Sequence, residues 1–147
     1  MPELSPYMQY ITIGQKKEMY TGLSNTNYPT LIFTLLIDSK ADINIKIEEI
    51  LVYVYMESCF MGKIRWNQLD NELEEIQPLL ARGSIWVNLH FTPPKDFLKS
   101  PMPKRWNLNG IVLFGAENYV QARKKFSILF KMKDHEFKSA LETYFRD

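Results

Sequence analysis

Few side chains in this 147-residue chain have the types and spacing needed for catalysis or metal binding. Its two histidines, His90 and His135, fall on different expected elements, and the single cysteine, Cys59, is adjacent to neither. A Cys/His nucleophile pair or a zinc site needs more such residues to converge. We therefore predict no catalytic, cofactor-binding or metal-binding residues. His90 is expected to be structural or a partner contact, and Cys59, in an apolar context, a buried small hydrophobe.

Two other patterns that could indicate an enzyme have simpler interpretations. The carboxylates at Asp70, Glu72, Glu74 and Glu75 fit the solvated face of a helix better than an acid/base or metal site. The six glycines are scattered singly, so no loop of the kind that cradles phosphate is present. The sequence thus predicts a non-enzymatic protein without a cofactor.

A basic, proline-rich segment at residues 92–105, TPPKDFLKSPMPKR, is the strongest functional candidate. Its four prolines exclude regular structure, and cations beside exposed apolar side chains suit an anionic membrane surface or a nucleoprotein. A second basic cluster opens a later strand and could extend the same surface. The candidate membrane or partner contacts are Lys95, Phe97, Lys99, Lys104, Arg105, Arg123, Lys124 and Lys125. The alternative is a solvated loop whose apolar members fold back onto the domain.

Length and composition indicate one globular domain, residues 1–147, with residues 1–27 partly flexible. The content of 46% hydrophobic and 24% charged residues is that of an ordinary globular protein. A net charge of +1 gives no global attraction to nucleic acid or membrane, so any basic patch must be local. The single cysteine fits a reducing compartment, and no run of 18 apolar residues predicts a transmembrane segment.

Periodicity predicts several elements. Strands are expected at residues 31–37, 85–91, 108–114 and 124–132, the second with Ile85, Val87, Leu89 and Phe91 on one face. Helices are expected at residues 67–80 and at a closing segment that begins near residue 134.

The stretch at residues 43–62, INIKIEEILVYVYMESCFMG, is expected to organise the core, but its pattern allows two conformations. Alternation of isoleucines with polar residues and a run of Val and Tyr favour a strand. The stripe of Ile47, Ile50, Leu51, Val54 and Met61 fits a helix that ends before Gly62. The residues alone do not decide between them.

The order of these segments resembles the matrix proteins of rhabdoviruses over about residues 30–120. The resemblance consists of a strand and a Ser-containing turn, a hydrophobic segment closed by an acidic residue, an aromatic and a glycine, a Leu-rich turn, and a Pro-Pro loop before a further strand. The matching positions are Phe33, Thr34, Leu35, Ile37, Ser39, Glu48, Glu57, Phe60, Gly62, Ile76, Leu80, Gly83, Ser84, Thr92, Pro93, Pro94, Pro101, Arg105, Leu108, Asn109 and Gly115.

The resemblance implies an α+β single domain in which an antiparallel sheet packs against two or three helices, one of them at residues 47–61. It implies a viral matrix protein that self-associates as a homo-oligomer, condenses the viral nucleocapsid and links it to the envelope in assembly and budding. Such a protein is found in the virion and host cytoplasm, peripheral to anionic membranes. The chain departs from the family in two respects. Matrix proteins usually carry a Lys-rich N-terminal arm, whereas the first fifteen residues here hold no lysine. They also usually carry a Pro-Pro-x-Tyr late-budding motif, of which Pro6-Tyr7 is only a fragment.

The alternative architecture follows if residues 43–56 form a strand. The chain is then an immunoglobulin-like β-sandwich with a C-terminal helix, and it faintly resembles the late-embryogenesis-abundant type of module. That resemblance implies a cytoplasmic binding or stress-protection function.

Overall fold

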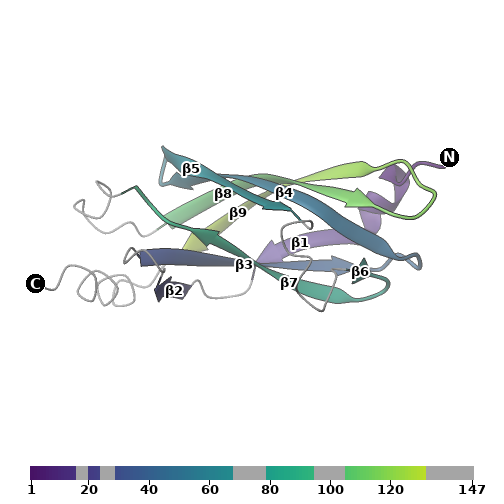
Figure 1. Cartoon of the computed structure of the whole chain (residues 1–147), viewed down its shortest axis with the longest axis horizontal. Helices are drawn as coiled ribbons and strands as arrows, with labels where there is room; N and C mark the ends of the chain where they lie inside the picture. Colours follow the sequence, from purple (N-terminus) through teal and green to yellow (C-terminus); the bar gives the residue numbers. More distant parts are fainter. Residues whose placement is uncertain (16–19, 24–28, 68–78, 95–104, 132–147) are drawn as a thin grey trace, which may run out of the picture.

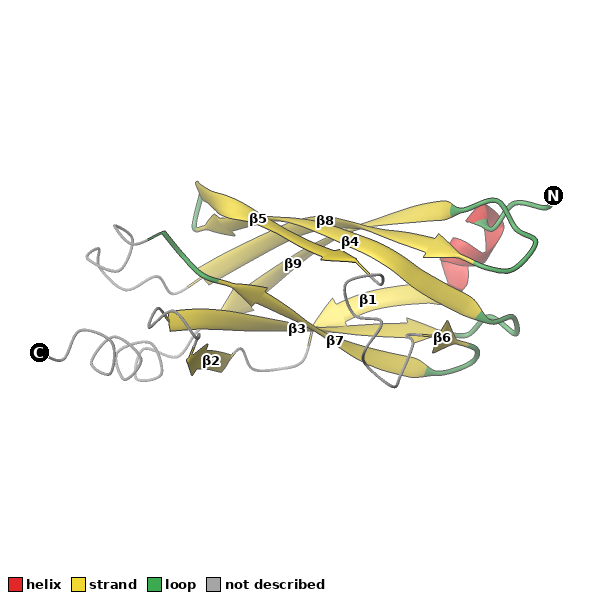
Figure 2. Ribbon diagram, viewed as in Figure 1, coloured by secondary structure: helices red, strands yellow, loops and turns green. Residues whose placement is uncertain are grey.

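The protein is a sandwich of two antiparallel β-sheets in a computed structural model, which describes residues 1–15, 20–23, 29–67, 79–94 and 105–131 (Figure 1). The described elements are η1 (Ser5–Tyr10), β1 (Ile11–Gln15), β2 (Tyr20–Leu23), β3 (Pro29–Ser39), β4 (Ile45–Met56), β5 (Cys59–Asn67), β6 (Leu79–Leu80), β7 (Ser84–Phe91), β8 (Arg105–Gly115) and β9 (Ala122–Lys131). Figure 2 shows η1, a short 3-10 helix near the N-terminus, as the one helical element within these ranges.

The first sheet, called the β4 sheet here, has the strand order β5-β4-β8-β9. β4 is its organising strand, because it pairs with β5 from Glu49 to Met56 and with β8 from Lys46 to Met56. The short strand β6 also pairs with the start of β4. The residues expected to organise the core thus form β4, a turn and β5.

The second sheet, called the β3 sheet, is built around β3. β1 pairs with its second half and β2 with its first, while β7 runs along most of its length from Leu31 to Asp38. In Figure 1 the two sheets lie one above the other as two layers.

The core fills the space between the sheets. Phe33 of β3 packs against Trp106 of β8 and Phe130 of β9, with ring centroids 6.0 and 5.1 Å apart, and so joins the layers. Along β4, Val52 and Val54 are fully buried while Tyr53 between them is exposed. This alternation is what a strand with one face on the core and one in solvent requires.

The predicted α+β class, with an antiparallel sheet packed on two or three helices, is therefore wrong for the described residues. The helix expected at residues 47–61 is instead the β4–β5 hairpin. Its turn is made by Glu57, which has a φ of 53° that a continuous helix cannot contain. The physical reason is composition: β-branched and aromatic side chains suit a pleated surface and lose rotamer freedom in a helix. The sandwich alternative is the nearer description.

The predicted strands are confirmed. Residues 31–37, 85–91 and 108–114 lie within β3, β7 and β8, and β9 covers the strand expected at 124–132 up to Lys131. β7 has the predicted faces, with Val87, Leu89 and Phe91 buried and His90 exposed. Of the helix expected at 67–80, Leu79–Leu80 form strand β6, while residues 68–78 and the closing helix lie outside the described residues.

No helix in the described ranges has the length and apolar character needed to cross a membrane. The expected partly flexible segment, residues 1–27, contains η1, β1 and β2 in its described parts.

Candidate anion-binding surface

The outer face of the β4 sheet collects most of the cations of its strands. In β9 every second side chain, from Arg123 to Lys131, is exposed, and in β5 exposed Lys63 and Arg65 flank buried Ile64. We call this outer surface the basic face. Its cations are Lys46, Lys63, Arg65, Arg105, Arg123, Lys125 and Lys131.

The carboxylates on the strands of the basic face are Glu48 and Glu49, both in the first half of β4. Glu49 accepts a hydrogen bond from Arg65, with Nε and Oε1 2.8 Å apart, and Glu48 accepts one from the Gln121 side chain. The half of the face nearer the β4–β5 turn has no strand carboxylate within the described residues, and only Glu57 in the turn itself is acidic there. Lys63, Arg105 and Lys131 in that half therefore have no strand carboxylate beside them within the described residues.

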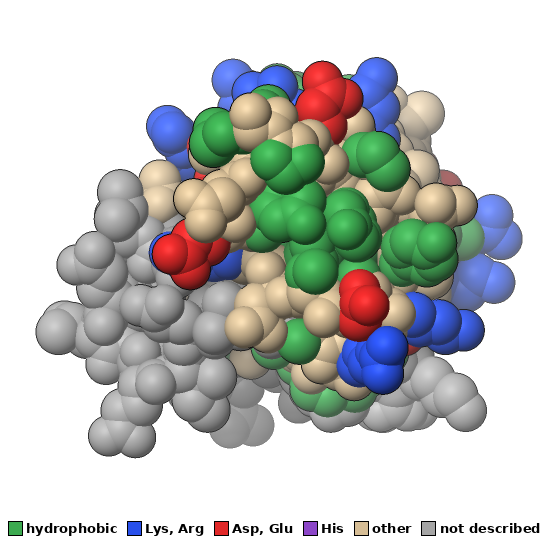
Figure 3. Space-filling view, turned by 90° about the vertical axis from the view of Figure 1, so that its right-hand side faces the viewer, with side chains coloured by type: hydrophobic (Ala, Val, Ile, Leu, Met, Phe, Trp, Pro, Cys, Tyr) green, Lys and Arg blue, Asp and Glu red, His purple; other side chains and the backbone are tan. Residues whose placement is uncertain are grey.

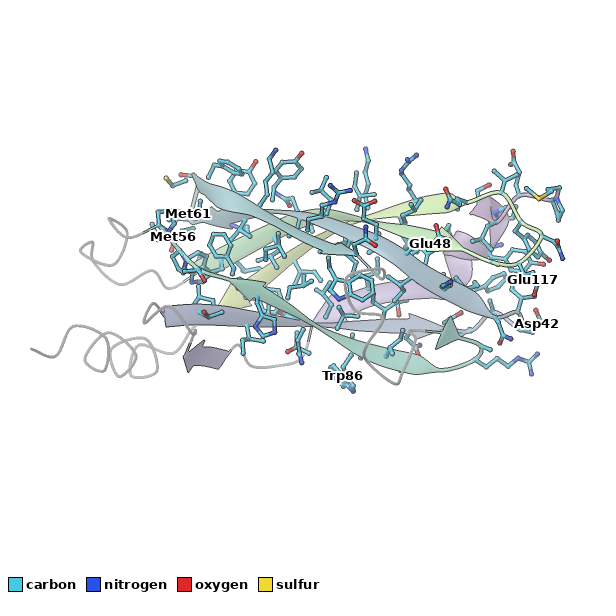
Figure 4. The ribbon with its side chains drawn as sticks, viewed as in Figure 1. Asp42, Glu48, Met56, Met61, Trp86 and Glu117 are labelled. Atoms are coloured by element: carbon cyan, nitrogen blue, oxygen red, sulfur yellow. The ribbon has the colours of Figure 1, made fainter. Side chains whose placement is uncertain are left out.

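Aromatic rings occupy the same half. Phe60 of β5 is 50% exposed, and its ring centroid lies 5.5 Å from that of Tyr55 and 6.2 Å from that of Tyr53. The ammonium of Lys63 lies 5.8 Å from the centroid of Tyr53. Figure 4 shows the side chains that stand out from this sheet, several of them ending in nitrogen, whereas Trp86 points away on the opposite side of the sandwich.

Polar side chains of β8 and β9 lie near the ring cluster. Asn107 and Asn109 of β8 lie opposite Leu129 and Ser127 of β9. Ser127 donates to the Asn109 side-chain oxygen at 2.7 Å, and the Asn107 amide donates to the Glu57 carbonyl oxygen at 3.2 Å. The face thus offers rings, cations and hydrogen-bonding groups on one side of one sheet.

Lys124 has a structural role, unlike its sequence neighbours Arg123 and Lys125. It lies on the inner side of β9, and its ammonium donates to the carbonyl oxygens of Met8 and Ile11, at 2.7 and 2.5 Å. It therefore ties η1 and β1 to the β4 sheet, and it does not belong to the basic face.

Of the other predicted contact residues, Arg105, Arg123 and Lys125 are on the basic face. Lys95, Phe97, Lys99 and Lys104 lie outside the described residues. Lys63, Arg65, Lys131 and the ring cluster were not predicted as contacts, although alternation along β4, β5 and β9 was the signal that could have indicated them.

The end of the sandwich that carries the N-terminus presents a second surface. Figure 3 shows apolar side chains gathered at the middle of this end with charged ones around them. Tyr7 of η1 and Tyr119 pack edge to face with centroids 5.7 Å apart, and their hydroxyl hydrogen bond is the main cause that raises the pKa of Tyr7 above its ordinary value. Backbone hydrogen bonds of Leu4 and Val120 hold the two segments together.

Within the described ranges, Cys59 of β5 and His90 of β7 lie on strands of different sheets. Cys59 is exposed at the start of β5, so the expectation that it is buried is wrong. The turn after Met56 carries it past the edge of the core. Among the described residues, no three side chains of His, Cys, Asp or Glu come together as a metal site would require.

Comparison with known proteins gives a likeness of fold. No protein-family model and no curated protein matches the chain. The chain is similar to the crystal structure of the "Putative ApaA Protein from Bordetella pertussis", with a TM-score of 0.57 and 12% identity over 84% of this chain and 94% of that one. A second X-ray structure, a target of the Northeast Structural Genomics Consortium, has a TM-score of 0.53 and 10% identity over 82% of this chain and 86% of that one. At these identities the likeness concerns the fold alone.

Proposed function

We propose that the protein is a non-enzymatic binding module that holds an anionic macromolecule against its basic face. The observation that carries the proposal is the charge distribution. Cations far outnumber carboxylates on one sheet face, in a chain whose net charge is only +1.

The geometry of the face supports a macromolecule rather than a small ligand. An open, pleated sheet surface encloses nothing, whereas small-molecule sites bury most of their ligand in a concave pocket. Cations on β5 and β9 lie at the two edges of the sheet, three strand spacings or about 14 Å apart. A partner must be wide or long to contact both edges.

Attraction of this kind must depend on salt. Each exposed Lys or Arg near an anionic surface contributes on the order of 1 kcal/mol, and the Debye length falls from about 30 Å at 0.01 M salt to about 10 Å at 0.1 M. Several cations together therefore give useful affinity at low ionic strength that weakens as salt rises.

Retention on a heparin column tests the proposal with a generic polyanion. The double variant Lys63→Ser/Lys125→Ser removes one cation from each edge of the basic face. The control Lys40→Ser/Arg82→Asn removes two exposed cations from segments outside the β4 sheet, so both proteins have the same net charge. We expect the first to elute at clearly lower salt and the control to elute with the parent. Equal shifts, or a parent that is not retained at low salt, would contradict the proposal.

A viral matrix function is the second candidate. The basic face, with its exposed rings, favours it because a matrix protein must contact both a nucleocapsid and an anionic membrane. The helix to which the resemblance assigned residues 47–61 is absent, so this candidate depends on the face and on self-association. Homo-oligomer formation is its distinguishing requirement, and sedimentation velocity measures that directly.

A further inference from the structure

We propose that the half of the basic face next to the β4–β5 turn binds single-stranded nucleic acid, with unpaired bases stacked on Phe60, Tyr53 and Tyr55. This inference deepens the proposed function, because it names the anionic partner of the same face.

The ring cluster has the properties of a stacking platform. Phe60 is half exposed on an outer strand, and Tyr53 is 36% exposed beside it on β4. Phe60 contacts both tyrosines, at centroid distances of 6.2 and 5.5 Å, so the three rings support one another before any partner arrives. Base–aromatic stacking tolerates any base sequence because every base has a π face.

Cations stand where the phosphates of a stacked strand would pass. Lys63 lies against the Tyr53 ring on one side of the cluster. On the other side, Tyr55 is opposite Asn107, and Arg105 lies two residues before Asn107 at the start of β8, opposite Lys131. Strand geometry puts the Cα atoms of Tyr55 and Arg105 about 8 Å apart, which a phosphate bonded to Arg105 and a base on the Tyr55 ring can span.

The polar side chains near the ring cluster favour a nucleic acid over a lipid surface. A membrane would receive the apolar side chains only by also covering Asn107, Asn109 and Ser127, and burying such groups without new hydrogen bonds is unfavourable. Base edges supply those hydrogen bonds, and in RNA the 2′-hydroxyls add to them. A duplex hides its base faces, so the rings select single strands.

Fluorescence anisotropy with a labelled 20-nucleotide thymidine strand tests the inference. Phe60→Ala removes the central ring, and Tyr10→Ala is the matched control, since Tyr10 is a 46% exposed aromatic outside the basic face. We expect Phe60→Ala to weaken binding about 5- to 150-fold, the effect of losing one stacked base, and Tyr10→Ala to bind as the parent does. Tyr53→Leu provides a second ring variant, and an unchanged thermal midpoint verifies that each variant folds.

Three results would overturn the inference: binding of Phe60→Ala within twofold of the parent, equal affinity for a duplex of the same length, or preference for phosphatidylserine vesicles over the thymidine strand. The salt dependence adds a check on the phosphate contacts, because Lys63→Ser should reduce the slope of log K against log salt by about 0.7. If heparin retention still depends on Lys63 and Lys125 while Phe60→Ala changes nothing, the inference fails and the proposed function stands.

Discussion

A carboxylate introduced at Val54 should destabilise the fold by an amount that depends on pH. Val54 is fully buried in β4, opposite Gly62 of β5 and Leu108 of β8. Val54→Asp loses the burial of a valine, about 1.5–3 kcal/mol. At pH 7 the new carboxyl must also be protonated to remain buried. Its ordinary pKa is about 3.9, about three units below pH 7, and each unit costs about 1.36 kcal/mol, so protonation costs about 4 kcal/mol. The total of about 6 kcal/mol rivals a domain's whole stability of about 5–15 kcal/mol.

The sign of the pH effect follows from proton binding. Burial raises the pKa of the new carboxyl in the folded state, so above about pH 4 the unfolded state binds fewer protons and stability falls as pH rises. Urea denaturation followed by circular dichroism should therefore show Val54→Asp regaining about 3 kcal/mol, relative to the parent, between pH 7 and pH 5.

The adjacent residue supplies the control. Tyr53 is exposed on the opposite face of the same strand, and Tyr53→Asp should cost less than about 1 kcal/mol at either pH. A Val54→Asp protein with the urea midpoint of the parent, or equal losses at the two positions, would refute the alternation of β4 on which the basic face depends.

Three further predictions concern packing, an interior contact and assembly. Gly110→Ala should cost about 1–3 kcal/mol, because a Cβ there would lie 2.9 Å from the Leu51 carbonyl oxygen, while Gly14→Ala, with nothing within 4 Å, should be near neutral in thermal denaturation. Lys124→Met should lower the free energy of unfolding by about 1–3 kcal/mol and leave heparin retention unchanged. Lys125→Met should weaken heparin retention and leave the free energy of unfolding unchanged. The matrix hypothesis predicts sedimentation coefficients that rise over a hundredfold concentration range, and a monomer throughout contradicts it.

Strand positions could be predicted from the sequence because their signal is local. Residues 85–91 alternate apolar and polar side chains, and β7 buries Val87 and Leu89 as that pattern requires. In β3, the short apolar run closed by Asp38 and Ser39 likewise marked a core strand. These segments need no knowledge of their partners to be recognised.

The conformation of residues 43–62 could not be predicted in the same way, because one set of apolar side chains fits both the periodicity of a helix and that of a strand. Ile47, Ile50 and Val54 lie on one helical stripe, yet in β4 they all face the core. They can do so because a β-bulge between Ile47 and Glu49 shifts the register by one residue. A bulge is set by pairing with β8, so the local pattern does not reveal it.

The candidate site was partly found for a related reason. Cations that are close together in the sequence include Arg105 and the cluster at Arg123 and Lys125, but they also include Lys124, which alternation turns to the other side of the sheet. Lys63 and Arg65 join the face through the pairing of β5 with β4, a relation between distant residues.

The sheet order also explains how a nearly neutral chain can contain a strongly basic surface. β4 separates β5 from β8, so residues more than forty positions apart, such as Lys63 and Arg105, share one face because each sits at an outward position of its own strand. The same alternation sends the apolar partners of these cations, Ile64 and Trp106, into the core. Alternation along each strand therefore determines both the core and the binding face. A slip of one residue in the register of β5 would bury Lys63 and expose Ile64. Conditions that destabilise the pairing of β5 with β4 should consequently weaken anion binding before the rest of the sandwich unfolds.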